Sequence, residues 1–134
     1  MASWQQGTPL PSLSKKVTQT QIAAYAKASG DHNPLHLDEA FARTTTFGGT
    51  IAHGMLGLAF INQMLAQAFG EAWPASGRLK VRFKAPVYPG DEVSIEGAVA
   101  RVQADGTGQQ VECQVTLKNA KGEEVVTGTA TVRL

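Results

Sequence analysis

Asp31 and His36 are the residues of this sequence whose types and spacing suit acid–base chemistry. They lie five positions apart, on either side of the turn at Asn33-Pro34. A carboxylate and an imidazole held close together can take up and return the protons of one water molecule. The proline fixes their separation at a low cost in entropy. The alternative interpretation is structural: Asp31 ends a helix in a turn, and His36 is a hydrogen-bonded histidine in the next loop.

A glycine-rich segment downstream offers the second part of a possible active site. Residues 48–54 read Gly-Gly-Thr-Ile-Ala-His-Gly and lead into the longest apolar run of the chain. Free backbone N–H groups at the start of a helix stabilise a developing negative oxygen. The pair and this segment together predict acid–base chemistry on water beside a polarised carbonyl group.

The three histidines, His32, His36 and His53, could in principle hold a metal ion. The proline turn separates His32 from His36 instead of placing both on one helix face, so the sequence does not favour zinc. The sequence also contains no Gly-x-Gly-x-x-Gly motif and no phosphate-loop motif. We therefore expect no metal site and no nucleotide-binding loop.

Composition predicts a globular protein with one domain over residues 1–134, of which residues 1–12 form an irregular N-terminal arm. Hydrophobic residues make up 43% and charged residues 17% of the chain, as in ordinary globular proteins. A net charge of +1 gives no field that would attract nucleic acid or an anionic membrane. The N-terminus lacks the basic start and apolar core of a signal peptide, so we expect a cytoplasmic protein. The single cysteine, Cys113, is expected to be a small buried residue in a strand.

The first half of the chain is predicted to be helical. Thr18-Gln-Thr-Gln21 has the form of a capping box that opens a helix at about 19–29. A short helix is expected at 38–43 and a long one at about 53–69, which has no polar face and should be wrapped on most sides. Residues 44–50 and 71–77 are expected to be loops.

From residue 78 onward the apolar residues recur with a period of two, which indicates strands. Four strands, centred on residues 79–85, 93–99, 111–117 and 126–134, follow one another through hairpin-length loops, and 13–17 is a short first strand. Consecutive antiparallel strands with one apolar face predict a meander. The fold class is therefore α+β, a curved antiparallel sheet wrapped around a long central helix.

Two motifs together resemble the signature of a known family. The first is Tyr25-x-x-x-Ser-Gly-Asp31-His-Asn33-Pro34-Leu-His36, and the second is Phe47-Gly-Gly-Thr-Ile-Ala-His53-Gly54-Met55. They closely resemble the MaoC-like (R)-specific enoyl-CoA hydratases, and residues 83–91 are similar to that family's second half. The resemblance implies a hot-dog fold, a homodimer whose sheets join edge to edge, an acyl-CoA thioester as substrate and no cofactor, because coenzyme A is part of the substrate.

The resemblance also implies roles for individual residues. Asp31 and His36 would activate one water molecule, which adds to the 2,3 double bond of a trans-2-enoyl thioester and gives the (R)-3-hydroxyacyl product. The backbone N–H of Gly54 would bond the thioester oxygen. Asn33 and Asn62 are expected to belong to the substrate-binding site together with Gly54. Asn33 has two interpretations, orienting the dyad or building the turn, and His53 is expected to be structural. Asn62 falls on the central helix at a position near the dyad where relatives often carry a small hydroxyl residue.

Three other functions remain open from the sequence. A dehydratase acting on 3-hydroxyacyl groups of an acyl carrier protein would run the same chemistry in reverse. A hot-dog thioesterase would hydrolyse the thioester, which the Asp31–His36 spacing argues against. A non-enzymatic hot-dog subunit would usually lack the dyad, which this chain keeps.

Overall fold

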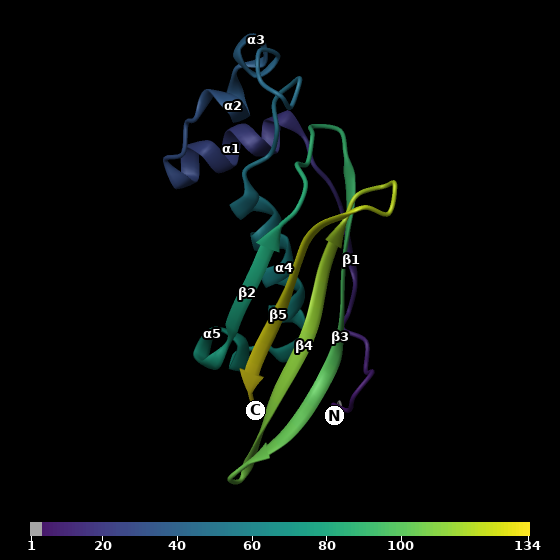
Figure 1. Cartoon of the computed structure of the whole chain (residues 1–134). Coiled ribbons are helices and arrows are strands. Elements are labelled where there is room, and N and C mark those ends of the chain that lie inside the picture. Colours follow the sequence, from purple (N-terminus) through teal and green to yellow (C-terminus); the bar gives the residue numbers. More distant parts are fainter. Residues whose placement is uncertain (1–3) are drawn as a thin grey trace.

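The structure, a computed structural model, describes residues 4–134, so the first three residues of the expected arm lie outside the described part. Five helices and five strands follow in the order β1 (Leu13–Lys16), α1 (Gln19–Ser29), α2 (Pro34–Leu37), α3 (Glu39–Ala42), α4 (Gly54–Phe69), α5 (Ala72–Ser76), β2 (Arg78–Phe83), β3 (Glu92–Asp105), β4 (Gly108–Lys118) and β5 (Glu124–Arg133). The strands form one curved antiparallel sheet with α4 against it, while α1, α2 and α3 gather at one end (Figure 1).

The order of strands across the sheet is β1-β3-β4-β5-β2. The predicted meander is confirmed for β3, β4 and β5 but is wrong for β2, which pairs with β5 and places Leu79 opposite Ala130. The link from β2 to β3, residues 84–91, instead crosses the end of the sheet. Eight extended residues can span up to ~26 Å, and three steps between strands cover only ~14 Å. Loop length alone therefore could not distinguish a hairpin from this crossing.

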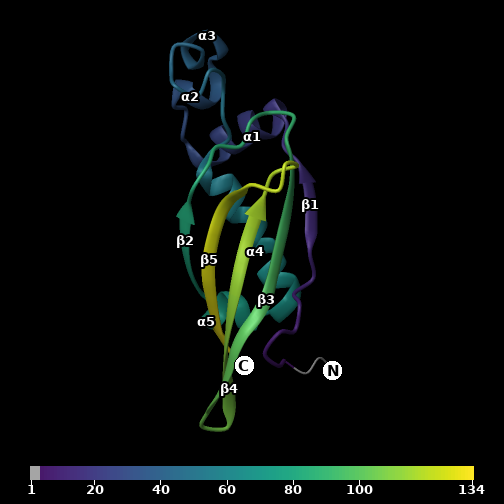
Figure 2. The ribbon, with the colours of Figure 1, turned by 45° about the vertical axis from the view of Figure 1, so that its right-hand side comes forward.

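The core lies between α4 and the sheet, whose curve encloses the helix in Figure 2. Ile61, Met64 and Leu65 of α4 are completely buried, as are Ile95 and Leu117 on the facing strands. Each such side chain contributes roughly 1.5–3 kcal/mol by leaving water. The expected long helix against a curved sheet is thus confirmed. The packing of α4 on the sheet places its first residues at the end of the molecule where α1, α2 and α3 gather.

One face of α4 remains open in the single chain, which differs from the expected burial on most sides. Met55, Ala59, Asn62 and Ala66 recur at helical spacing and are exposed, and Met55 keeps 54% of its surface accessible. The sheet covers only the opposite face of the helix. Among residues 4–134, none of the helices combines the length and apolar character needed to cross a membrane.

Several local predictions can be compared with the structure directly. The Oγ1 atom of Thr18 accepts the N–H of Gln21 (3.1 Å) and caps α1. The reciprocal half of the capping box is not formed, because Oε1 of Gln21 is buried without a partner among the described residues. The predicted loop at 71–77 is wrong, since α5 occupies most of it. Cys113 is buried in β4 as expected, and burial raises the pKa of its thiol to about 11.

Candidate active site

Asp31 is held in a turn that starts where α1 ends. Gly30 closes the helix with a φ of 80°, a left-handed conformation that glycine adopts without strain. The backbone N–H of Asp31 then donates to Oγ of Ser29 (3.2 Å), and Oδ1 of Asp31 accepts the N–H of Asn33 (3.2 Å). Oδ1 of Asn33 in turn accepts the N–H of Leu35 (3.0 Å) and caps α2. The structure thus shows Asn33 building the turn; a contact with substrate stays a prediction.

His36 lies on α2 with one ring nitrogen already occupied. Its Nδ1 lies 2.8 Å from the carbonyl oxygen of Ile51. Because a carbonyl oxygen only accepts hydrogen bonds, we assign the proton of the neutral ring to Nδ1, which leaves Nε2 with a free lone pair. The side-chain amide of Gln19 also donates to the backbone carbonyl of His36 (2.8 Å). The contact with Ile51 therefore orients the ring, the bond from Gln19 holds the backbone, and Nε2 of the ring stays available.

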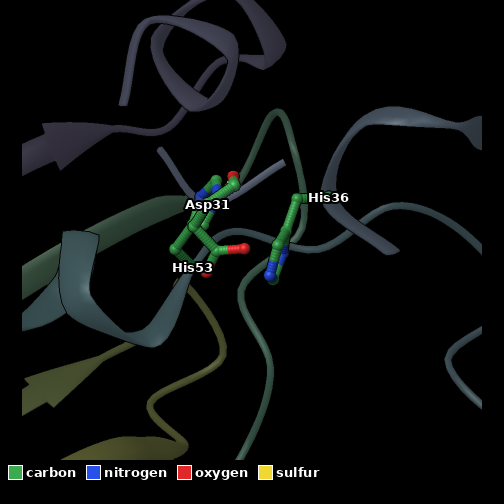
Figure 3. Close-up of side chains that lie close together, drawn as sticks. All are labelled: Asp31, His36 and His53. Carbon is green, nitrogen blue, oxygen red and sulfur yellow. The ribbon is translucent and has the colours of Figure 1, made fainter. Parts of the chain in front are cut away.

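The structure brings Asp31 and His36 together, as the sequence predicts. A carboxylate oxygen of Asp31, a ring nitrogen of His36 and a ring nitrogen of His53 all lie within 4.8 Å of one another. Figure 3 shows a carboxylate oxygen of Asp31 pointing toward the ring of His36. Asp31 is exposed and His36 is half-buried, so water can reach the pair.

The start of α4 provides backbone donors beside this pair. His53 is the N-cap residue of α4 but makes no side-chain capping bond, and Gly54 is the first helical residue. The first N–H groups of a helix have no partner within it. A Cβ atom at position 54 would lie 3.0 Å from the ring of Phe83. The absence of a side chain at Gly54 therefore leaves room for a ligand to approach this backbone N–H closely.

His53, expected to be structural, is buried in contact with both members of the dyad. Only 3% of its surface is exposed, its ring stacks on His36 with centroids 3.9 Å apart, and its Nε2 lies 3.0 Å from the carbonyl oxygen of Asp31. Tyr25 packs on it as well, with ring centroids 4.8 Å apart. Tyr25 and His53 both belong to the two motifs, and that membership was the signal that could have identified them.

The cluster of Asp31, His36 and His53 has the composition of a metal site but not the geometry of one. A histidine binds a metal through a lone pair in its ring plane, at about 2.0–2.1 Å for zinc. The two rings are stacked with an interplanar angle of only 28°. Their lone pairs therefore run side by side instead of converging on one point. His32, the third histidine, is exposed and lies outside this cluster.

A hydrogen-bonded network connects the glycine-rich loop to α1 and α3. Glu39 of α3 accepts the backbone N–H of Thr50 (3.3 Å) and lies 3.1 Å from its hydroxyl, which also contacts Gln19 (2.9 Å). The hydrogen bonds from Thr50, with Arg43 nearby, hold the pKa of Glu39 below its usual value. This network could not be predicted from the sequence, because its members are far apart along the chain.

Asn62 lies apart from the start of α4. It follows Gly54 by just over two turns of the helix, and its side-chain oxygen accepts the indole N–H of Trp73. It lines a shallow groove together with Tyr25, Met55 and Trp73. A role for Asn62 in binding substrate stays a prediction.

An apolar cavity of about 310 Å³ opens beside the start of α4. His53, Gly54, Gly57, Leu117 and Val126 are among the residues that line it. Carbon-rich side chains make up most of its wall, which suits the hydrocarbon part of a ligand. The cavity adjoins the N–H groups of α4 and the ring of His53.

Comparison with known proteins identifies the family. A family model described as MaoC like domain matches residues 2–123. An (R)-specific enoyl-CoA hydratase of Aeromonas caviae is 37% identical over 91% of this chain and 90% of its own length. An (R)-specific enoyl-CoA hydratase of Rhodospirillum rubrum is 35% identical over 90% of this chain and 82% of its own length.

The fold has a close counterpart among solved structures. The (R)-hydratase from A. caviae involved in PHA biosynthesis superimposes with a TM-score of 0.85 at 34% identity, covering 100% of this chain and 99% of that one. The predicted hot-dog fold is thereby confirmed. The chain belongs to the family of MaoC-like domains.

Proposed function

We propose that the chain is an (R)-specific enoyl-CoA hydratase, which converts a trans-2-enoyl-CoA into an (R)-3-hydroxyacyl-CoA. The observation that carries this proposal is the meeting of the Asp31 carboxylate with the His36 ring beside the uncapped start of α4. The similarity to hydratases of A. caviae and R. rubrum supports it.

In the proposed reaction one water molecule lies between Asp31 and the free Nε2 of His36. The dyad removes a proton from this water as its oxygen bonds to C3 of the enoyl group. The electron pair of the double bond moves toward the thioester carbonyl, and a proton returned from the dyad to C2 completes the addition of H₂O. Both additions take place on the same face of the double bond, and the (R) product requires that the water attack the corresponding face of C3.

Gly54 stabilises the charge that develops during this step. Electron density accumulates on the thioester oxygen as the water adds, and the backbone N–H of Gly54 donates to it. Such a bond is stronger in the transition state than in the bound substrate, which is what accelerates a reaction. One donor of this kind typically contributes on the order of 3 kcal/mol. We assign the acyl chain to the apolar cavity that adjoins Gly54.

The second candidate is the same chemistry in reverse. A 3-hydroxybutyryl-CoA dehydratase of Methylorubrum extorquens is 32% identical over 85% of this chain and 70% of its own length. Hydration and dehydration share one dyad and one transition state, so this relative favours a dehydratase as the alternative. A dehydratase that requires an acyl carrier protein would act slowly on coenzyme A substrates, and a thioesterase would release free thiol.

We also propose that the protein works as a homodimer. β2 is an edge strand of the sheet, so one row of its backbone groups has no strand partner within residues 4–134. Phe83 at its end is 52% exposed, and Met55 on the open face of α4 is 54% exposed. Leu79 and Met55 line one groove, so the edge strand and the open helix face are continuous. Exposed apolar surface of this kind marks an interface.

The remaining parts of the proposal concern cofactor, compartment and product. We propose that the reaction needs no cofactor beyond the coenzyme A carried by the substrate. A cytoplasmic location accords with the single cysteine, Cys113, which is free and buried. Because the A. caviae structure is described as involved in PHA biosynthesis, we propose that the (R)-3-hydroxyacyl product supplies polyester synthesis.

Hydration of crotonyl-CoA by the purified protein tests the proposed function. We expect the absorbance of the enoyl thioester to fall, (R)-3-hydroxybutyryl-CoA to form, and free thiol to stay at its background level. Formation of the (S) product or release of thiol would contradict the hydratase assignment. Activity on acyl-carrier-protein substrates alone would favour the dehydratase.

A further inference from the structure

We infer that His53 is a positioning residue that holds Asp31 and His36 in their reactive arrangement, an inference that rests on the proposed hydratase function. Thr50 and His53 are the buried polar residues among those the structure describes. Burying a polar ring costs free energy unless its nitrogens are bonded. The buried ring of His53 makes two kinds of contact with the dyad, a hydrogen bond and ring packing.

His53 donates a hydrogen bond to the main chain of the catalytic aspartate. Its Nε2 lies 3.0 Å from the carbonyl oxygen of Asp31, and a carbonyl oxygen can only accept. Asp31 is otherwise held through its N–H, which bonds Ser29, and through its carboxylate, which bonds Asn33. The bond from His53 is the one that ties this turn to α4, where Gly54 supplies the N–H for the thioester.

His53 also contacts two other rings. Tyr25 packs against it in a tilted arrangement at 4.8 Å and 56°, and His36 stacks on it at 3.9 Å and 28°. The ring of His36 is therefore fixed in its plane by the bond to Ile51 and out of its plane by the face of His53. These two contacts together fix the direction in which Nε2 of His36 points.

The second nitrogen of His53, Nδ1, is buried and has no hydrogen-bond partner among the described residues. The hydrogen bond from Nε2 and the ring contacts are therefore what His53 provides to the dyad.

A purely structural role would be to cap or stabilise α4, and the contacts do not fit that role. The side chain of His53 makes no capping bond to the helix, and its unpartnered Nδ1 lowers stability. An apolar ring in its place removes that unpartnered atom. The carbonyl of Asp31, on an exposed residue, can then bond water. A positioning role and a structural role thus predict opposite effects on stability.

Two substitutions separate the contacts of His53. His53→Phe keeps a ring for the stack but loses the donor, and we expect kcat on crotonyl-CoA to fall about 10- to 100-fold, as misplaced catalytic groups typically cause. KM should stay within about twofold, and the thermal midpoint should be unchanged or higher. His53→Gln loses the ring but can place its Nε2 near the same carbonyl, and we expect it to regain part of the lost kcat.

A double variant tests whether His53 acts through the dyad. In the background of Asp31→Asn, His53→Phe should cause no further loss, because effects of groups that act as a unit are not additive. Three results would overturn the inference: wild-type kcat in His53→Phe, a fall in kcat matched by a fall in thermal midpoint without rescue by glutamine, or an undiminished effect in the double variant. A wild-type protein that does not hydrate crotonyl-CoA would instead refute the proposed function.

Discussion

At the scale of single residues, the site is assembled by short-range bonds in one turn and by contacts that reach across the chain. The turn was predictable, because Asp31, Asn33 and Pro34 all favour it locally. The structure confirms that this turn brings His36 close to Asp31. The contacts of His53 were not predictable. They depend on where the carbonyl of Asp31 points and on the stacking of His36, which only the packed fold determines.

Gly54→Pro removes the proposed thioester donor, with Gly54→Ala as its matched control. Proline is favoured at the first helical position, and the ψ of 138° at His53 suits a residue before proline. Both variants place a Cβ near Phe83, but only alanine keeps the N–H. We expect kcat of the proline variant on crotonyl-CoA to lie about 10²- to 10³-fold below that of the alanine variant. Equal kcat values in the two variants would contradict the role of this N–H.

At the scale of elements, α4 connects the site with the core and with the cavity. Its existence and length were predicted from the apolar run, and the period of two correctly indicated the strands. The position of β2 beside β5 was not predicted, because the crossing of residues 84–91 leaves no signal in the local sequence. The open face of α4 was missed for a related reason: an apolar helix does not show which of its sides the chain itself covers.

Gly57→Leu should shorten the acyl chains that the enzyme accepts. Gly57 lines the cavity one turn after Gly54, and a Cβ there would lie 3.4 Å from a methyl of Leu117, an ordinary contact. A leucine side chain would fill the space beyond, whereas alanine would leave most of it. We expect kcat/KM for a C8 enoyl-CoA to fall at least tenfold relative to crotonyl-CoA in the leucine variant and to change little in Gly57→Ala. A parallel loss for both chain lengths would contradict this assignment of the cavity.

Glu39→Gln should remove a pH-dependent part of the stability of the glycine-rich loop. The pKa of Glu39 is lowered from 4.5, chiefly by hydrogen bonds from Thr50. A lowered pKa in the folded state stabilises the fold above pH 4.5 and loses this effect as the pH falls through the lowered value. We therefore expect the wild type to be more stable than the variant at pH 7 and the difference to shrink toward pH 3. Urea unfolding at both pH values measures this, with the exposed Glu123→Gln as control; an unchanged difference would refute it.

At the scale of the whole molecule, the single chain leaves an edge strand and an apolar helix face uncovered on one side. A second copy of the chain would cover both, and that is the assembly we propose. Met55→Glu places a charge in the centre of this surface, so we expect the molar mass from light scattering to fall from dimer to monomer at micromolar concentration. Gln67→Glu, an exposed position on the same helix, should remain dimeric. A monomeric wild type, or a dimeric Met55→Glu, would contradict the proposed interface.

The hydration rate of Asp31→Asn shows whether the Asp31 carboxylate drives the reaction. The amide keeps an oxygen that can accept the N–H of Asn33, so the turn should persist while the negative charge and proton acceptor are lost. Glu123→Gln removes the same charge at an exposed position. We expect Asp31→Asn to lower kcat on crotonyl-CoA by about 10²- to 10⁴-fold with an unchanged thermal midpoint, while the control stays at the wild-type rate. A folded Asp31→Asn protein with near-normal turnover would contradict this role of the carboxylate.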